Sequence, residues 1–356
     1  MKKFLAIVIL TFLFLGNLYS QIPAGYYDSA DGLTGQELQE ALHQIIKNHN
    51  SVSYNSLHTY FEQTDKKPNG KVWDMYSDVP GGTPPYSYNF VSSDQCGNYS
   101  HEGDCYNREH SWPKSWFGGK VYPMYSDLFH IYPTDGYVNS KRSNYPYGEV
   151  SNPTWTSQNG SKLGNCSYPG YSGIVFEPID EYKGDFARSY FYMSVRYYSE
   201  DGSWQSNGMV SRSQLKPWAL NMLRNWNDND PVSQKEIDRN NAVYQIQENR
   251  NPFIDHPEYA FRIWDSSASV NDFYISASDI NVYPNPVIDY CFISINKIQR
   301  ISDFEIFITD ITGRKIETNY QITGNLIKLN TKYFNRGIYF VNLVNDNFYL
   351  NLKIVK

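Results

Sequence analysis

A carboxylate and an imidazole stand side by side at Glu109 and His110, inside the stretch CYNREHSWPKSWFGG. Carboxylate oxygens are ligands that hard cations such as Mg²⁺ prefer, and a histidine can accept a proton from water near neutral pH. A bound cation beside such a base is one way to hydrolyse a phosphodiester bond. The pair therefore predicts one metal ligand, Glu109, and one general base, His110.

A second oxygen ligand is expected from the segment DLFHIYPTDGYVNSKRSN, which reads as a strand followed by a short helix beginning near Asp135. In that helix Asn139 lies four residues after Asp135 and three before Arg142, so the three side chains share one face. A strand with the Glu-His pair, a second strand and a helix presenting Asn139 would form a β-β-α arrangement. The alternative is that Asn139 is a surface amide, since asparagine is common near short helices.

The geometry of a strand limits how this pair can work, because adjacent side chains point to opposite faces. Glu109 and His110 can serve one site only where the strand ends or is distorted, and Pro113 shortly downstream fits such an ending. A zinc site made by His101, His110 and His130 is an alternative, since histidine is a common zinc ligand. The spacing of these histidines follows no compact ligand pattern.

Several motifs in order extend the pattern, and with them the chain resembles the bacterial endonuclease I family, secreted nucleases of the ββα-metal superfamily. The resemblance spans residues 32 to 264 and rests on NREHSWPKSW, SDLFHIYP, VNSKRSN, FEPIDEYKGDFARSYFYMSVRY and NRNPFIDHPE. It implies that His110 is the general base and that Glu109 and Asn139 bind Mg²⁺, with Ca²⁺ or Mn²⁺ as alternatives. The implied activity is endonucleolytic cleavage of DNA and RNA with little sequence preference, leaving 5′-phosphate ends.

A phosphate in such a site is expected to be held by an arginine, whose planar guanidinium can bind two phosphate oxygens at once. Arg108, two residues before the base, is favoured; Arg142, one turn after Asn139, and its neighbour Lys141 are the other candidates. Between residues 107 and 146 the chain has five Lys or Arg against three Asp or Glu, although its net charge is −6. A locally basic cleft would bind through phosphates, whereas the net charge argues against coating nucleic acid through bulk positive charge.

The expected fold class is α+β, in two domains. Residues 25–265 would form a ββα-metal nuclease core with a small sheet and surrounding helices, and residues 280–356 a small all-β sandwich, because apolar residues alternate there at strand spacing. The small, polar residues 266–279 are expected to be a linker.

Two helix starts are predicted from capping signals. Thr34 with Glu37 forms a capping box, and Asp230 precedes a proline that suits the first helical position. In the first of these helices an apolar face leaves His43 and His49 as expected surface residues.

Aromatic rings follow the Glu-His pair closely in the sequence. Trp112, Trp116 and Tyr132 are candidates for stacking on bases, but burial in the core is the favoured interpretation for the tryptophans.

Four cysteines occur in a chain that is expected to be exported, where disulfides are common. Cys96 and Cys105 lie close in sequence, and a bridge between them would fix the loop that leads into the Glu-His pair. Four cysteines nevertheless allow three full pairings. Cys291 is expected to be unpaired, and a cysteine zinc site is disfavoured because no Cys-x-x-Cys pair occurs.

Both ends of the chain indicate export to the medium or the cell surface. Residues 1–20 have two lysines, an apolar run and a small polar exit, the layout of a signal peptide. The apolar run is shorter than the ~20 residues of a membrane span, so no stable span is expected and an uncleaved anchor is the lesser alternative. The segments VYPNPV, DITGRKI and RGIYFVNL resemble the Por-type C-terminal sorting domain of type IX secretion, which implies that residues 280–356 bind that machinery.

Two other functions stay open at this level. A secreted glycoside hydrolase would use tyrosine-rich surfaces and two facing carboxylates. A non-catalytic protein that binds nucleic acid or a surface would need only the sorting domain. No heptad or other interface pattern predicts an oligomeric state.

Overall fold

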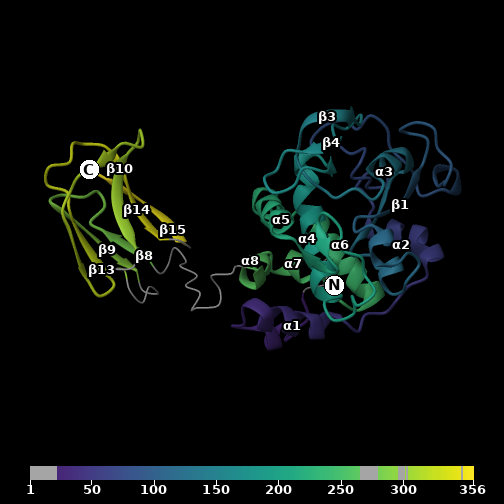
Figure 1. Cartoon of the computed structure of the whole chain (residues 1–356), viewed down its shortest axis with the longest axis horizontal. Helices are drawn as coiled ribbons and strands as arrows, with labels where there is room; N and C mark the ends of the chain where they lie inside the picture. The colour runs from purple at the N-terminus through teal and green to yellow at the C-terminus, as the bar shows by residue number, and fades with distance from the viewer. Residues whose placement is uncertain (1–21, 265–279, 296–300, 302–303, 346–347) are drawn as a thin grey trace, which may run out of the picture. The chain divides into compact units, whose positions relative to one another are not determined.

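The structure is a computed structural model that describes residues 22–264, 280–295, 301, 304–345 and 348–356 (Figure 1). The chain divides into two compact units, Met1–Asp265 and Ser266–Lys356. The predicted α+β class holds in its coarser form, a mixed helix-and-sheet unit followed by a β-rich unit. The expected signal peptide, 1–20, and linker, 266–279, lie outside the described residues, and the domain boundaries stay a prediction.

The first unit contains helices of varied length between short sheets. Its α-helices are α1 (Gly35–Ile46), α2 (Leu57–Thr64), α3 (Gly136–Arg142), α4 (Lys183–Arg196), α5 (Pro217–Asn229), α6 (Gln234–Gln247), α7 (Pro252–Asp255) and α8 (Tyr259–Trp264). Single 3₁₀ turns are η1 (Asp28–Ala30), η2 (Tyr54–Ser56), η3 (Ser92–Asp94), η4 (Lys114–Phe117), η5 (Met124–Ser126) and η6 (Asp180–Tyr182).

Helix α4 is the centre of this unit and contacts α1, α5 and α7 (Figure 1). Every residue of α4 after Lys183 is buried, including Phe186, Tyr190, Phe191 and Tyr192. Burial of large aromatic side chains is the main favourable contribution to folding. The aromatic richness of the sequence therefore supplies the core around which the other elements pack.

Strands β1 (Tyr106–His110) and β2 (Ile131–Asp135) form a two-stranded antiparallel sheet, and α3 follows β2 directly. Tyr106 lies opposite Asp135, and His110 opposite Ile131. Asp135 ends β2 and also caps α3, because its Oδ1 accepts the backbone N–H of Val138 at 2.7 Å. The order strand, strand, helix expected from the sequence is thus present around the Glu-His pair.

The remaining strands of the first unit form two further sheets. β3 (Val150–Thr156), β4 (Lys162–Cys166) and β5 (Ile174–Glu177) pair in that order, and β6 (Val210–Ser211) pairs with β7 (Gln214–Leu215).

The second unit consists of two antiparallel four-stranded sheets that share one apolar core. Its strands are β8 (Ile280–Tyr283), β9 (Tyr290–Ile295), β10 (Glu305–Asp310), β11 (Lys315–Ile316), β12 (Tyr320–Thr323), β13 (Leu326–Asn330), β14 (Ile338–Asn345) and β15 (Phe348–Val355). The sheet orders are β11-β10-β14-β15 and β12-β13-β9-β8. Within the described ranges, no helix combines the length and the apolar character that a membrane crossing requires.

Candidate active site

Glu109 lies on the side of β1 that carries a buried ion pair. Its Oε1 accepts the hydroxyl of Tyr76 at 2.9 Å and lies 3.0 Å from Nη1 of Arg142. Both side chains of the pair are almost fully buried. Burial raises the pKa of Glu109 above its usual value, and the nearby guanidinium and the tyrosine hydroxyl offset only part of this rise. The carboxylate is therefore held in one position by groups that favour its charged form.

Arg142 links helix α3 to the end of β1. Nη1 donates to the carbonyl of His110 at 2.8 Å, and Nη2 donates to the carbonyl of Ser111 and, at 3.2 Å, to the hydroxyl of Tyr190. Its guanidinium carbon lies 4.6 Å from the ring centroid of Tyr147. The side chain that was a phosphate candidate thus has its terminal nitrogens directed into the protein, next to the predicted catalytic residues.

His110 points to the opposite face of β1 and is also buried. Its Nε2 lies 3.2 Å from the carbonyl oxygen of Tyr125. A carbonyl can only accept, so Nε2 carries the proton and Nδ1 keeps a free lone pair. Burial, with a smaller effect from His130, lowers the pKa of His110 well below its usual value. The imidazole is neutral at pH 7 and has the protonation state of a base.

Arg108 lies two residues before His110, so both side chains project from the same face of β1. They share one neighbour: the Tyr54 ring lies 4.1 Å from the Arg108 guanidinium carbon and 5.9 Å from the His110 ring. Nη1 of Arg108 donates to the Tyr54 carbonyl at 3.3 Å. Its buried Nε makes no hydrogen bond within the described part of the chain. A cationic donor without a partner suits an anion such as phosphate.

Asn139 is half-buried on α3, three residues before Arg142, and therefore on the same face of the helix. No hydrogen bond joins its side-chain amide to another described residue. A carboxylate and an amide oxygen are the donors that a hard cation takes, with water in its other positions. Glu109 and Asn139 are of the right chemical types for such a cation.

Lys141 belongs to a different surface of α3. Its Nζ lies 5.0 Å from the ring centroid of Tyr137 and 6.0 Å from that of Trp155 on β3. Two residues along a helix correspond to a rotation of about 200°. Lys141 therefore does not share the face of Asn139 and Arg142.

The alternative histidine zinc site is not assembled. His110 and His130 have ring centroids 5.6 Å apart, but His101 is exposed. Across the residues that the structure describes, no group of three or more His, Cys, Asp or Glu side chains is placed to hold a metal ion. The site expected from Glu109 and Asn139 contains only one residue of these four types, so it is not a group of this kind.

Sequence reasoning missed the tyrosines that surround the pair. The hydroxyls of Tyr76 and Tyr147 lie 2.9 Å apart beside Glu109, and the Tyr190 hydroxyl donates to the Ser111 carbonyl at 2.9 Å. The chain has 32 tyrosines, so a tyrosine at these positions carried no distinguishing signal.

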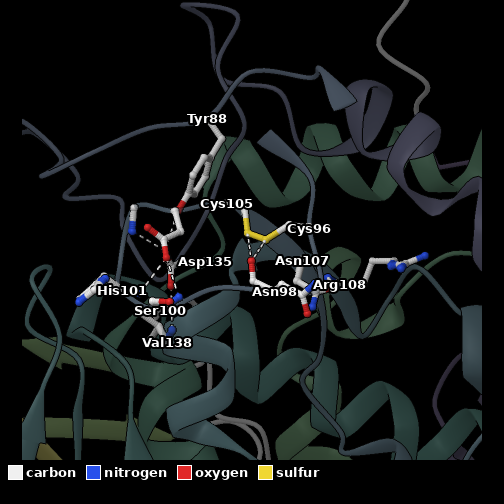
Figure 2. The surroundings of a disulfide bond; sticks show 12 residues. Tyr88, Cys96, Asn98, Ser100, His101, Cys105, Asn107, Arg108, Asp135 and Val138 are labelled. Carbon is white, nitrogen blue, oxygen red and sulfur yellow. Dashed lines mark hydrogen bonds between the residues drawn. A yellow bond between two sulfur atoms is a disulfide. The ribbon is translucent and has the colours of Figure 1, made fainter. Parts of the chain in front are cut away.

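The predicted disulfide is present. Cys96 and Cys105 are bonded, with Cα atoms 5.7 Å apart, directly before β1 (Figure 2). The backbone N–H of Gly103 in the closed loop donates to Oδ2 of Asp135 at 2.8 Å, and the Tyr88 hydroxyl donates to the same oxygen at 2.6 Å. The loop is thereby fastened to the residue that caps α3.

The other cysteines and the tryptophans agree with expectation. Cys166 and Cys291 are free. Trp112 and Trp116 are buried in the core, as predicted, and Tyr132 is buried with them.

Comparison with known proteins gives matches to both units. A family model described as Endonuclease I matches residues 34–258, and one described as Secretion system C-terminal sorting domain matches residues 281–356. An extracellular ribonuclease of Bacillus amyloliquefaciens is 36% identical over 245 residues, 67% of this chain and 78% of the relative.

Two further relatives, which match a shorter part of this chain, are also named as nucleases. Endonuclease-1 of Buchnera aphidicola subsp. Acyrthosiphon pisum (strain APS) is 28% identical over 130 residues, 36% of this chain and 44% of the relative. An extracellular deoxyribonuclease of Aeromonas hydrophila is 25% identical over 134 residues, 37% of this chain and 50% of the relative.

Proposed function

Because this chain belongs to the Endonuclease I family, we propose that Glu109, His110 and Asn139 form its active site. The chain is a secreted nuclease that hydrolyses phosphodiester bonds. Its substrates are DNA and RNA, cut internally with little sequence preference to 5′-phosphate ends. Relatives named as ribonuclease and as deoxyribonuclease support both substrates.

The observation that carries the proposal is the hydrogen bond between His110 Nε2 and the Tyr125 carbonyl. It fixes the tautomer in which Nδ1 is the acceptor, and burial keeps the ring neutral. His110 Nδ1 takes a proton from the attacking water as the water oxygen bonds to phosphorus. The bond from phosphorus to the 3′ oxygen then breaks and that oxygen takes a proton from solvent water, which leaves a 3′ hydroxyl and a 5′ phosphate.

The divalent cation of this family would be held by Glu109 and Asn139, and Mg²⁺ is the cation we propose, with Ca²⁺ or Mn²⁺ as substitutes. When bound, such a cation supplies charge stabilisation to the phosphate and the leaving oxygen. Tyr76 and Arg142 keep the Glu109 carboxylate oriented. This preorganisation fixes the ligand before the cation arrives.

The two arginines near the site have separate tasks in this proposal. Arg108 binds the scissile phosphate through its unpartnered Nε and the free donors beside it. Arg142 positions β1 by binding the carbonyls of His110 and Ser111. Lys141, on its separate surface, would contact a phosphate elsewhere along the strand.

The test is cleavage of supercoiled plasmid by the full chain in Mg²⁺ and in EDTA. Wild-type protein should nick and linearise the plasmid only with the cation, and His110→Ala should lose that activity by at least about a hundredfold. His101→Ala, which changes an exposed histidine, is the matched control and should keep full activity. Products bearing 3′-phosphates would overturn the mechanism, and cleavage that survives His110→Ala would overturn the site.

The second unit would direct export. We propose that residues 280–356 are recognised by the type IX secretion machinery, in line with the sorting-domain match. A chain that ends at residue 279 should keep its cleavage activity in cell extracts but stay out of the medium. Export of that shortened chain at the normal level would contradict the proposal.

A further inference from the structure

Three tyrosines, Tyr54, Tyr122 and Tyr125, form an aromatic group next to His110, and Tyr122 is its exposed member. Its side chain is 50% exposed, whereas Tyr125, three residues later, is 6% exposed. Exposed aromatic rings beside a nucleic-acid site are the usual platforms for base stacking, because every base has a flat apolar face. The position of Tyr122 relative to the active site decides whether it can act in this way.

The Tyr122 ring is held at two points. Its hydroxyl accepts the backbone N–H of Tyr54 at 3.4 Å, and its ring meets the Tyr125 ring edge-on, with centroids 5.6 Å apart and planes at 89°. A ring that is already fixed loses little conformational freedom when a ligand stacks on it. The exposed surface of Tyr122 is therefore preorganised for a planar partner.

A chain of ring contacts connects Tyr122 to the proposed catalytic residues. Tyr125 lies 5.5 Å from the His110 ring at an angle of 15°, and 4.1 Å from the Tyr54 ring at 16°. Tyr54 in turn lies under the Arg108 guanidinium. Tyr122 is thus two ring contacts from His110 and belongs to the same group as the phosphate-binding candidate.

The charges around this surface fit a phosphate backbone. Lys114 and Lys120 are exposed. The charge of Lys114 lowers the pKa of His110, and the charge of Lys120 lowers the pKa of Tyr125. Both lysines therefore lie close enough to these rings to act on them electrostatically. With Arg108, which stacks on the Tyr54 ring, they place three positive charges near the rings that adjoin Tyr122. Positive charges near the site favour a phosphate backbone there.

We propose that Tyr122 stacks on one unpaired base of the strand being cut, so that the enzyme prefers single-stranded nucleic acid to duplex. The inference rests on the proposed active site and adds the substrate class to it. Bases inside a duplex are stacked and paired, and their faces are not available to a side chain. The contribution of Tyr122 is therefore realised only with an unpaired nucleotide.

The experiment compares the full chain with Tyr122→Ala on a labelled single-stranded DNA oligonucleotide and on its duplex, in Mg²⁺. We expect kcat/KM for the single strand to fall by about tenfold, the usual scale for one base–aromatic contact, and kcat/KM for the duplex to change by less than about twofold. Tyr122→Phe keeps the ring and its contact with Tyr125 but loses the hydrogen bond to Tyr54, so it should lose less than about threefold on the single strand and nothing on the duplex. Tyr333→Ala, which removes an 84% exposed tyrosine of the second unit, is the matched control.

An abasic scan locates the base. In wild type, an abasic nucleotide at one position near the cut should lower kcat/KM by about tenfold, and Tyr122→Ala should be insensitive at that position. Equal losses on single strand and duplex, a Tyr122→Phe variant as impaired as Tyr122→Ala, or an identical abasic profile in both proteins would overturn the proposal.

A binding measurement separates this inference from the catalytic one. In EDTA, the fluorescence of a 2-aminopurine oligonucleotide should be quenched by wild type and by Tyr333→Ala, but not by Tyr122→Ala. Absence of cleavage on every substrate would refute the proposed active site, while unchanged quenching by Tyr122→Ala would refute the stacking site alone.

Discussion

The two faces of strand β1 differ in what their charged side chains contact. On one face, Glu109 is paired with Arg142 and bonded to Tyr76, although Nε of Arg142 has no hydrogen bond to another described residue. On the other face, Arg108 keeps an Nε without a hydrogen bond, and His110 keeps an acceptor at Nδ1.

The difference indicates a division of labour along one strand. Ion pairing and hydrogen bonds hold the Glu109 carboxylate in place, whereas Arg108 and His110 meet mainly the Tyr54 and Tyr125 rings and keep a donor and an acceptor for a ligand. The face of Glu109 fixes the geometry of the site, and the face of Arg108 and His110 is left ready for the phosphate and the water. Each prediction below changes a group that lies on, or packs against, one of these faces.

The largest effect is expected from Arg142→Met. Removing one partner of a buried ion pair leaves an uncompensated charge on Glu109, which typically costs about 3–5 kcal/mol of unfolding free energy. Urea unfolding followed by tryptophan fluorescence measures it, because all 8 tryptophans lie between residues 73 and 264, in the first unit. Lys66→Met, which breaks an exposed pair with Glu62, should cost below about 1 kcal/mol. A similar cost for both variants would show that Glu109 does not depend on Arg142.

Lowering the pH should reduce the stability of the fold through the histidines next to His110. Burial lowers the pKa of the neighbouring His130 to about 4, below its usual value of about 6.5. A histidine whose folded pKa is depressed gives stability that is complete above the unfolded pKa and is lost as pH falls through the folded pKa. The loss between pH 6.5 and 4 should approach about 3 kcal/mol, since each unit corresponds to about 1.4 kcal/mol.

Variants separate the two faces in this experiment. His130→Gln should reduce the fall in stability between pH 6.5 and 4 and leave the part due to His110 and His58, whose pKa values burial also lowers. Glu109 has a raised pKa and contributes in the opposite direction, so Glu109→Gln should not flatten it. An acid limb that is unchanged in His130→Gln would contradict the assignment to the histidine.

A smaller effect on stability, and a clear one on activity, is expected from Arg108→Ala. Loss of one charge-assisted contact to phosphate corresponds to about 2 kcal/mol, or roughly a thirtyfold fall in kcat/KM. The slope of the logarithm of binding affinity against the logarithm of salt concentration should also become shallower, by the roughly one unit that one phosphate contact contributes. Lys66→Ala, a cation outside the site, is the control for general charge. An unchanged salt slope would exclude Arg108 from phosphate binding.

The chemistry of the site could be proposed from the sequence and stays a prediction, whereas the surroundings of the site could not be proposed. Glu109 and His110 were proposed from their residue types and adjacency, and Arg108 from the family resemblance. Tyr76 and Tyr147 could not be, since they reach Glu109 from distant positions in a chain full of tyrosines.

The contacts of helix α1 with distant parts of the chain could not be predicted either. His43 and His49 were expected on the surface, but both are buried: His43 bonds the carbonyl of Val195 at 3.0 Å, and His49 lies beside Asp127. Amphipathic spacing locates the apolar face of α1 but does not show that α4 covers polar flanks as well.

The two predicted helix starts were close to the observed ones but differ in detail. A helix begins after Thr34, although the Thr34 side chain makes no capping bond. The helix expected at Asp230 begins at Gln234, where Ser233 and Glu236 form a complete capping box. A local capping signal marks the region in which a helix begins, and the competition between neighbouring caps decides the residue.

The smallest effect is expected from Tyr76→Phe, which removes one hydroxyl from Glu109 and leaves Arg142 in place. The stability cost should be about 1 kcal/mol, the usual net value of one hydrogen bond. The affinity for Mg²⁺, measured by calorimetric titration, should fall by about tenfold, because such partners orient a metal ligand and tune its charge. Tyr27→Phe is the matched control: its hydroxyl donates to Asp255 at 2.7 Å, far along the chain from the site. That variant should lose similar stability with unchanged Mg²⁺ affinity, and equal affinity losses would mean that Tyr76 acts only through the fold.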